Sequence, residues 1–472
     1  MMRTLLGLLL AASCAQAAPT FSKDIAPILF QNCASCHRPG QVAPFSLLNY
    51  TDAAKRAKLI AAVTTSHYMP PWKPESGYGH FTGERRLSDS EIRLISEWAK
   101  AGAPEGDAKD LPKPPVFQSG WFAGNPDLTL TLPAPSEVAA DGPDQFRCFV
   151  LPYQGDAEKF VKSMEFRAGN PRVVHHALLF VDTSGRAKQL DATTPEPGYS
   201  CFGGPGFVPG GLLGGWAPGA LPRQLPEGLA TTIPKGADLV VQIHYHPSGK
   251  PESDKSVIGL RFTGAPSVGL TSVVLGSRKI DIPAGDSHYE VKTSVVIPED
   301  VKAIGITPHA HYLCRDMKVT AHLPDGTVTP LIWIKDWDFN WQGNYSFAEP
   351  VALPKGTRVA LDYVYDNSSG NPRNPSNPPK RVTFGEQTTD EMALAFMAVT
   401  LPDPAQVPKF RRELRMRLLA QALSEGLDLS QLDPARAALI RPLIQRFDRN
   451  GNGVLDPSER EALIHFLEVR RY

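Results

Sequence analysis

Six of the twelve histidines in the sequence fall into three close pairs, and each pair stands in a run of β-branched and aromatic residues. The pairs are His175 with His176, His244 with His246, and His309 with His311. Residues two apart on a strand share a face, whereas adjacent residues point to opposite faces. His175 and His176 can therefore act together only where the strand bulges or ends. Three such pairs favour metal ligation over isolated core or surface histidines.

A second motif with chemistry is CASCH, from Cys33 to His37. CxxCH is the attachment signature of c-type haem, in which Cys33 and Cys36 form thioethers to the haem and His37 ligates the iron. A CxxC redox pair would need a βαβ setting, and a zinc site would need a second Cys or His pair nearby. Neither is evident, so haem is favoured. Met69, on a proline-bounded loop in SHYMPPW, is the candidate for the second axial ligand.

Helices are expected on both sides of this motif. Residues 22–32 have helical apolar spacing, and residues 86–104 contain a capping box, Ser88 with Glu91, followed by an amphipathic pattern. Together with CxxCH and the methionine loop, residues 19–106 resemble a class I cytochrome c. The resemblance implies a small all-α haem domain.

The pattern changes after a charged, proline-rich linker at residues 107–126. Short strand-like runs such as LTLTL, LVVQIHYH and VIGLRF alternate with turns rich in Gly, Pro and Asn up to residue 402. The 45 prolines and 39 glycines of the chain also favour turn-rich β architecture. The sequence therefore predicts two tandem all-β sandwiches, at residues 127–275 and 276–402.

Four stretches of this β region, VVHHALLF, VQIHYHP, HAHYL and TTDEM, resemble in the same order the copper type II, ascorbate-dependent monooxygenases. That family includes dopamine β-monooxygenase and peptidylglycine α-hydroxylating monooxygenase. The resemblance covers about residues 127–402 and implies two jelly rolls that each hold one copper ion. It implies a first site of His175, His176 and His244, and a second site of His309, His311 and Met392.

The ligand types agree with this assignment. Three imidazoles suit a copper ion that changes oxidation state, and two imidazoles with a thioether favour Cu(I). In the family the second site activates O2 and abstracts a hydrogen atom from a substrate carbon, while the first site stores and passes on the extra electron. Met317 and Met397 are rivals to Met392 by residue type, and Met392 is preferred because TTDEM matches the family. His246 matches no ligand that can be carried over.

Two departures bear on the substrate. The peptide-amidating enzyme has an arginine where Thr307 stands here, and a tyrosine where Phe396 stands. A peptidylglycine substrate is therefore not expected, and the sequence selects no replacement. Cys148 and Cys201 occupy positions that resemble a disulfide of the family's first jelly roll. Cys314 is left over, either as an inert buried thiol or as a further ligand.

The N-terminus reads as an export signal over residues 1–18. Arg3 precedes a short apolar core, and a small-residue cleavage site ends at Ala17 or Ala18. A lipid anchor on Cys14 is the weaker alternative. We expect no transmembrane segment and an exported, periplasmic protein. Lysine plus arginine and aspartate plus glutamate both number 49, which argues against a nucleic-acid partner.

The C-terminal residues 403–472 are predicted to be α-helical, with an EF-hand loop, DRNGNGVLDPSE, between the last two helices. Gly453 would make its sharp turn. The expected calcium ligands are Asp448, Asn450, Asn452, the Val454 carbonyl, Asp456 through water, and Glu459. A helix–turn–helix that binds no ion is the alternative.

These features predict an exported copper-dependent monooxygenase that hydroxylates a C–H bond of a small-molecule or peptide-like substrate with O2. Its cofactors would be two copper ions, covalent haem c and calcium. Electrons are expected to pass from the haem to the first copper and then to the second, with ascorbate or a redox protein as an alternative external donor. The competing hypotheses are a non-catalytic copper- and haem-binding protein, and a plain haem electron carrier whose β domains dock a partner.

Overall fold

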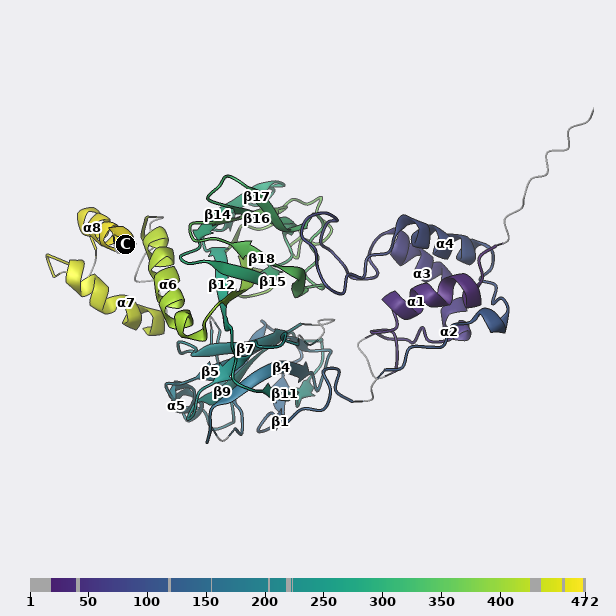
Figure 1. Cartoon of the computed structure of the whole chain (residues 1–472), viewed down its shortest axis with the longest axis horizontal. Helices are drawn as coiled ribbons and strands as arrows, with labels where there is room; N and C mark the ends of the chain where they lie inside the picture. Colours follow the sequence, from purple (N-terminus) through teal and green to yellow (C-terminus); the bar gives the residue numbers. More distant parts are fainter. Residues whose placement is uncertain are drawn as a thin grey trace, which may run out of the picture. The chain divides into compact units, whose positions relative to one another are not determined.

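The computed structural model describes residues 18–39, 43–117, 120–153, 155–202, 204–217, 222, 224–424, 434–451 and 455–469. Contacts divide the chain into two compact units. One comprises Met1–Trp72 with Glu84–Phe117 and is helical; the other comprises Lys73–Gly83 with Gln118–Tyr472 and is mostly β-sheet (Figure 1). Residues 73–83 were predicted to belong to the haem domain, but their contacts lie with the β-rich unit.

The helical unit has a short core built around one aromatic cluster. Phe21 packs against Tyr50 and Trp98, with ring centroids 5.6 and 6.2 Å away. The predicted capping box is present, because Glu91 N–H donates to Ser88 Oγ and Ser88 N–H donates to Glu91 Oε2. Its helices are the π-helical turn η1 (Phe21–Ile25), α1 (Ala26–Asn32), α2 (Tyr50–Ala54), α3 (Ala57–Thr65), α4 (Asp89–Lys100) and the 3₁₀ turn η2 (Ala108–Asp110).

The first sandwich of the β-rich unit pairs a five-stranded sheet, in the order β6-β3-β9-β5-β7, with a four-stranded sheet, β1-β11-β4-β8. All its strand pairs are antiparallel. The strands are β1 (Leu128–Thr131), β3 (Gln145–Val150), β4 (Lys159–Arg167), β5 (Val174–Asp182), β6 (Tyr199–Ser200), β7 (Gly211–Trp216), β8 (Thr231–Ile233), β9 (Asp238–Tyr245) and β11 (Val257–Thr263). A small pair, β2 (Ser136–Val138) with β10 (Glu252–Asp254), and the helix α5 (Arg186–Asp191) complete it.

The second sandwich has two four-stranded sheets, β12-β21-β15-β18 and β14-β19-β16-β17, also antiparallel. The strands are β12 (Gly269–Ser277), β14 (Tyr289–Val296), β15 (Val301–His309), β16 (Cys314–His322), β17 (Val328–Ile334), β18 (Tyr345–Leu353), β19 (Arg358–Tyr365) and β21 (Ala393–Leu401). A short pair, β13 (Asp281–Ile282) with β20 (Val382–Thr383), lies beside them. The prediction of two jelly-roll-like sandwiches is confirmed.

Burial explains why these runs form strands. In β12 buried and less buried residues alternate, as expected when one face of a sheet meets the core. Strand β9 is buried along its whole length, because it is central in the five-stranded sheet and covered on both faces. Its mostly apolar run, from Leu239 to Ile243, leads directly to His244. His244 therefore lies near the end of a strand that is buried along its whole length.

After residue 403 the chain is helical, as predicted. The 3₁₀ turn η3 (Pro404–Gln406) leads into α6 (Val407–Ser424), followed by α7 (Pro434–Phe447) and α8 (Pro457–Val469). Helix α6 lies along the second sandwich, where Arg411 Nε donates to Thr271 Oγ1 at 2.8 Å. Leu423 of α6, Leu455, and Leu463 of α8 share a small apolar cluster.

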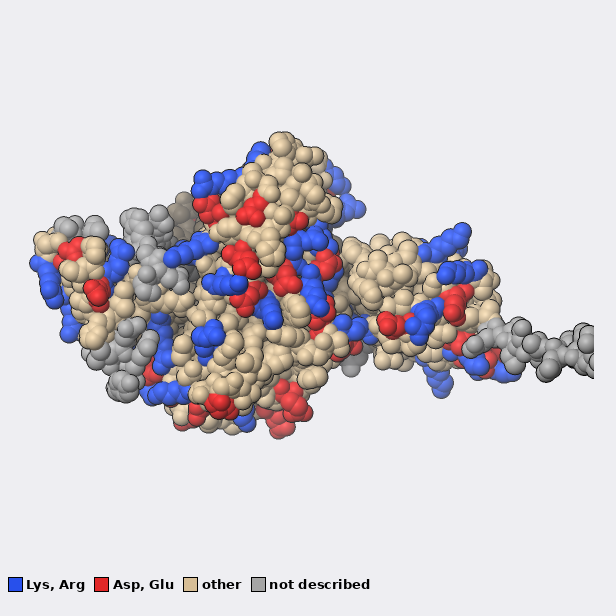
Figure 2. Space-filling model, turned by 90° about the horizontal axis from the view of Figure 1, so that it is seen from above, with Lys and Arg blue, Asp and Glu red and all other residues tan. Residues whose placement is uncertain are grey.

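The surface carries no large patch of one sign on the face drawn in Figure 2, where basic and acidic side chains are interspersed. This agrees with the net charge of zero. In the described part of the chain, no helix has the length and apolar character needed to span a membrane.

Candidate metal centre

A β-bulge lies at the first histidine pair. Strand β5 pairs with β9 so that Val174 faces Tyr245 and His176 faces His244, which leaves His175 as the extra residue. The sequence required such a bulge if the adjacent histidines were to act together, and this expectation is confirmed. The distortion brings imidazoles from two neighbouring strands to one place.

The three imidazoles converge through the same ring nitrogen. His176 Nδ1 lies 3.3 Å from His175 Nδ1 and 3.2 Å from His244 Nδ1. A ligand atom from each ring lies within 4.8 Å of the others. Two nitrogens that bind one ion at about 2.0 Å in tetrahedral geometry lie about 3.3 Å apart. The spacing therefore fits a three-imidazole metal site.

Burial keeps two of these imidazoles, those of His175 and His176, neutral. It lowers the pKa of His175 to about 3 and that of His176 well below its usual value, with repulsion from His244 adding to both shifts. Neutral imidazole is the form that binds a metal. His175 and His176 are therefore ready to ligate at neutral pH.

Asp144, which no sequence motif indicated, lies beside the outer ring nitrogens of this cluster. Its Oδ1 accepts from His246 Nδ1 at 2.6 Å, and its Oδ2 lies 3.1 Å from His244 Nε2, although this second pair lacks hydrogen-bond geometry. Burial alone would raise the pKa of Asp144, but the neighbouring His244, His246 and Thr388 outweigh it and hold the pKa below its usual range. An ionised carboxylate beside Nε2 favours a proton there and leaves Nδ1 for a metal.

Asp144 also joins the two sandwiches. Thr388 N–H donates to its Oδ2 at 3.1 Å, and its own N–H donates to Gln387 Oε1 at 3.2 Å. Gln387 and Thr388 precede the TTDEM methionine in the second sandwich. One buried side chain thus contacts the first histidine set and the loop that carries part of the second.

We expect Asp144→Asn to weaken copper binding at the first site by about 10–100-fold, the usual cost of losing an outer partner of a metal-bound histidine. The amide keeps the size of the side chain but not the charge that orients His244. Chelator competition would measure this, with the exposed loop residue Asp325, changed to Asn, as the control. Wild-type affinity in Asp144→Asn would contradict the orienting role.

The second histidine pair presents the opposite ring nitrogens. His309 Nδ1 lies 2.6 Å from Gln342 Oε1, and His311 Nδ1 lies 3.0 Å from the Asp390 carbonyl oxygen. Both acceptors fix a proton on Nδ1, so Nε2 of each ring is the atom left for a metal. The rings are 5.3 Å apart at 83°. Burial, with repulsion from His309, lowers the pKa of His311 to about 3.

The Glu391 carboxylate binds backbone N–H groups next to the second set of candidate ligands. It is fully buried and accepts from the N–H groups of His311, Leu313 and Met392 at 2.9, 2.6 and 3.2 Å. Burial raises its pKa to about 8 against these donors. The acidic pair inside TTDEM, Asp390 and Glu391, is the sequence signal that points to this role.

The candidate methionine ligand differs from its rivals in burial. Met392 is half-buried and precedes β21, two residues before the Leu394 that pairs with His309. Met317 and Met397 are fully buried within strands of the second sandwich, where they serve as core residues. The role of Met392 as the thioether ligand of the second site stays a prediction.

Phe339 links the two histidine sets. Its ring stacks on His175 with centroids 4.6 Å apart, and meets His311 edge-on at 5.5 Å. A cavity of about 170 Å³ opens beside it. The first sandwich contributes one wall and the second the other; the lining residues include Arg172, Val174, His175, His246, Tyr312 and Phe339. His246, which matched no ligand of the family, therefore lies at this cavity.

The haem-motif residues lie at the end of α1. Cys33 caps the helix, and the His37 N–H donates to the Cys33 carbonyl at 2.9 Å. His37 Nδ1 lies 3.2 Å from the Phe45 carbonyl oxygen, which fixes the proton there and leaves Nε2 for iron. Cys33 and Cys36 are not bonded to each other, and burial raises the pKa of Cys33 to about 12. This donor set fits covalent haem.

Met69 belongs to the same helical unit. It is half-buried on the loop after α3, and its N–H donates to the Val63 carbonyl at 3.0 Å. Its role as the second axial ligand stays a prediction.

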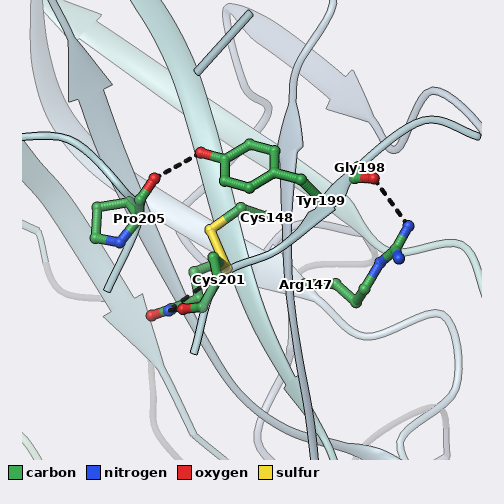
Figure 3. Close-up of a disulfide and its surroundings, with 7 residues drawn as sticks. Arg147, Cys148, Gly198, Tyr199, Cys201 and Pro205 are labelled. Atoms are coloured by element: carbon green, nitrogen blue, oxygen red, sulfur yellow. Dashed lines mark hydrogen bonds between the residues drawn. A yellow bond between two sulfur atoms is a disulfide. The ribbon is translucent and has the colours of Figure 1, made fainter. Parts of the chain in front are cut away.

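The structure contains the disulfide between Cys148 and Cys201 that the family resemblance implied (Figure 3). It joins β3 to the residue after β6, with the Cα atoms 5.8 Å apart. Tyr199 lies beside it and donates its hydroxyl to the Pro205 carbonyl at 2.7 Å. The disulfide is compatible with export. Cys314 is a fully buried free thiol.

The predicted calcium loop is described in part, because Asn452, Gly453 and Val454 lie outside the described residues. Glu459 is buried and accepts from the N–H groups of Arg449 and Asp456 at 2.6 and 3.1 Å. Asp456 caps α8 by accepting from Ser458 and Glu459 N–H. Asp448 and Asn450 directly follow α7. The EF-hand assignment stays a prediction.

No protein-family model and no curated protein matches the chain. Similar solved structures include PNGase F, a glycosylasparaginase from Flavobacterium meningosepticum, at 12% identity, over 58% of this chain and 96% of that chain, with a TM-score of 0.22. The major capsid protein P2 of bacteriophage PM2 is 10% identical over 52% of this chain and 99% of that chain, with a TM-score of 0.21. The infectious bursal disease virus VP2 subviral particle is 10% identical over 60% of this chain and 72% of that chain, with a TM-score of 0.17. Similarity this weak carries no argument about function.

Proposed function

We propose that the chain is an exported copper-dependent monooxygenase that hydroxylates a C–H bond with O2, with electrons supplied through its own c-type haem. The observation that carries the proposal is the paired geometry of the two histidine sets. One set converges through Nδ1 on the first sandwich, and the other leaves Nε2 unused on the second. Both meet Phe339 beside one cavity.

Copper bound by these sets would supply the one-electron chemistry that activates O2 for attack on a C–H bond. The residues of the chain prepare that chemistry. Asp144 orients His244, and the Asp390 carbonyl orients His311. Phe339 and the buried Val174 give the cavity an apolar wall. A space of about 170 Å³ suits a small substrate or one side chain of a larger substrate.

The two departures from the peptide-amidating enzyme lie opposite each other. Thr307 on β15 pairs across the sheet with Phe396 on β21, and Thr307 Oγ1 donates to Asn344 Oδ1 at 2.5 Å. This pair offers no positive charge to a carboxylate. It supports a substrate other than a peptidylglycine.

Metal content and oxygen incorporation test the proposal. Copper-loaded protein, supplied with ascorbate, ¹⁸O2 and a panel of small aromatic and aliphatic compounds, is expected to bind two copper ions and one haem. It should place one ¹⁸O atom in a product, as measured by mass spectrometry. Copper content near zero would favour the plain haem carrier. Bound copper with no oxygenated product from the panel would favour the non-catalytic copper- and haem-binding protein.

A further inference from the structure

A second cavity, of about 730 Å³, opens on the first sandwich and shares no lining residue with the cavity beside Phe339. Its volume is within the range of about 300–1,000 Å³ that is typical of small-molecule sites. It is formed by the loop of residues 121–125, which precedes β1, and by the adjacent strand β11, which pairs with β4 (Figure 1). All its walls therefore belong to one sandwich.

The alternation of side chains along β11 explains why a polar face lines this cavity. Ile258 belongs to the buried core, so Gly259 and Arg261 point to the opposite face of the sheet. Gly259 pairs across the strands with Glu165 of β4. Because Gly259 has no side chain, the Trp121 ring packs directly on the sheet: a Cβ on Gly259 would lie 2.7 Å from Trp121 Cζ3. Trp121 forms one wall of the cavity in this way.

Ala123 anchors the loop to the sheet. It is buried, and its N–H donates to Glu165 Oε2 at 2.9 Å. Its carbonyl accepts from Arg261 Nη1 at 2.6 Å and from Gln224 Nε2 at 3.2 Å. Glu165 also forms an ion pair with Arg167 at 2.9 Å. The loop and Arg167 therefore occupy the Glu165 carboxylate, and the walls are held in place without a ligand.

Four side chains at the cavity have binding capacity left. Among the described residues, Arg261 has no carboxylate partner, and its Nε and Nη2 make no hydrogen bond. Gln224 uses only its Nε2, which leaves Oε1 as an acceptor. The Asn125 amide is exposed and has no side-chain partner in the part of the chain that the structure describes. Phe122 is 43% exposed.

These groups define the chemistry of a ligand. Nε and Nη2 form the side-on fork of a guanidinium, which binds a carboxylate through two parallel N–H bonds. Amides both donate and accept, which suits hydroxyl groups. The negative face of an aromatic ring attracts the C–H bonds on the apolar face of a sugar ring. A simple aromatic acid would leave both amides without partners, and a neutral sugar would leave the guanidinium without one.

We propose that this cavity binds an acidic saccharide, that is, a sugar ring that carries a carboxylate. The free fork of Arg261 binds the carboxylate, Asn125 and Gln224 bind ring hydroxyls, and Phe122 packs against the ring. The site binds without forming or breaking a covalent bond. It does not depend on the copper and haem chemistry proposed above, and it gives the first sandwich a second role in holding the chain on an acidic glycan.

Calorimetric titration of the full exported chain tests the site. The protein is first treated with chelator, so that acidic sugars cannot bind through copper or calcium. The probes are trigalacturonate, trimannuronate and sialyllactose, which separate uronates from sialic acids. At least one should bind at one site per chain, and its methyl ester should bind about tenfold more weakly, because the ester loses the charge-assisted bonds to the fork.

Three outcomes of these titrations would overturn the proposal. If none of the three probes binds, the cavity is not a site for acidic saccharides. If the methyl ester binds as tightly as the acid, Arg261 does not recognise a carboxylate. If inorganic phosphate binds as tightly as the best saccharide, the cavity is a general anion site.

Variants locate the binding in this cavity. Arg261→Gln should weaken binding of the best probe by about tenfold or more, and Arg261→Lys should restore only part of it, because lysine keeps the charge without the fork. Arg261→Gln also removes the bond to the Ala123 carbonyl, so Phe122→Ala is the second variant. It trims an exposed ring and should weaken binding by about threefold or more.

An arginine of the second sandwich provides the matched control. Arg358 is exposed on β19, and Arg358→Gln should bind the probe with wild-type affinity. Wild-type affinity in both Arg261→Gln and Phe122→Ala would show that the saccharide binds elsewhere on the chain. A loss of affinity in Arg358→Gln equal to that in Arg261→Gln would show that net charge, rather than the cavity, attracts the probe.

Discussion

Replacement of His176 by alanine is expected to lower the copper content of the loaded protein from two ions per chain to one. His176 Nδ1 lies between those of His175 and His244, at 3.3 and 3.2 Å. Without it the remaining pair cannot complete the three-imidazole site. We expect the copper affinity of this site to fall by more than about 100-fold, beyond the cost of losing an outer partner. Elemental analysis after dialysis against a weak chelator measures the loss.

The second site should keep its copper in this variant. Its histidines belong to the other sandwich and receive their hydrogen-bond acceptors from Gln342 and Asp390. His288→Ala removes an imidazole that is 72% exposed and is the matched control, with an expected content of two ions. Met392→Ala should show the reverse pattern and weaken Cu(I) at the second site only. If His176→Ala loses both ions while circular dichroism shows a folded protein, the division into two separate sites is wrong.

The sequence predicted those parts of the structure that depend on local patterns. Alternating apolar residues predicted the two sandwiches, and the capping box of Ser88 with Glu91 predicted the start of α4. The need for a bulge at His175 also followed from local geometry, because adjacent side chains on a regular strand diverge. Such features are encoded within a few residues of where they appear.

The parts that the sequence did not reveal depend on contacts between distant residues. Asp144 lies about a hundred residues before His244 and still farther from Thr388, and no motif surrounds it. Phe339 is one of 21 phenylalanines, and only the fold places its ring between His175 and His311. Residues 73–83 pack against the edge strands β17 and β18, through Glu75 N–H to the Trp333 carbonyl and Thr82 N–H to the Ser346 carbonyl. Which strands are edges is a property of the topology rather than of the segment itself.

The second large effect is expected at the haem motif. Cys36→Ser should sharply reduce the covalent haem retained on a denaturing gel, because a serine oxygen cannot form the thioether. At most one attachment, through Cys33, would remain. In the structure both thiols are free, and the Phe45 carbonyl beside His37 Nδ1 leaves Nε2 for an iron, so the motif could form both thioethers. Peroxidase staining of equal protein loads gives the measurement.

A cysteine outside the motif provides the control for this change. Cys314 is also a free thiol, but it is fully buried in the second sandwich and has no place in CxxCH. Cys314→Ser should leave the haem stain at the wild-type level, while the double change Cys33→Ser with Cys36→Ser should abolish it. The order expected is wild type equal to Cys314→Ser, then Cys36→Ser, then the double variant. A stain of wild-type strength in Cys36→Ser would contradict haem attachment through both thiols of the motif, on which the proposed haem domain depends.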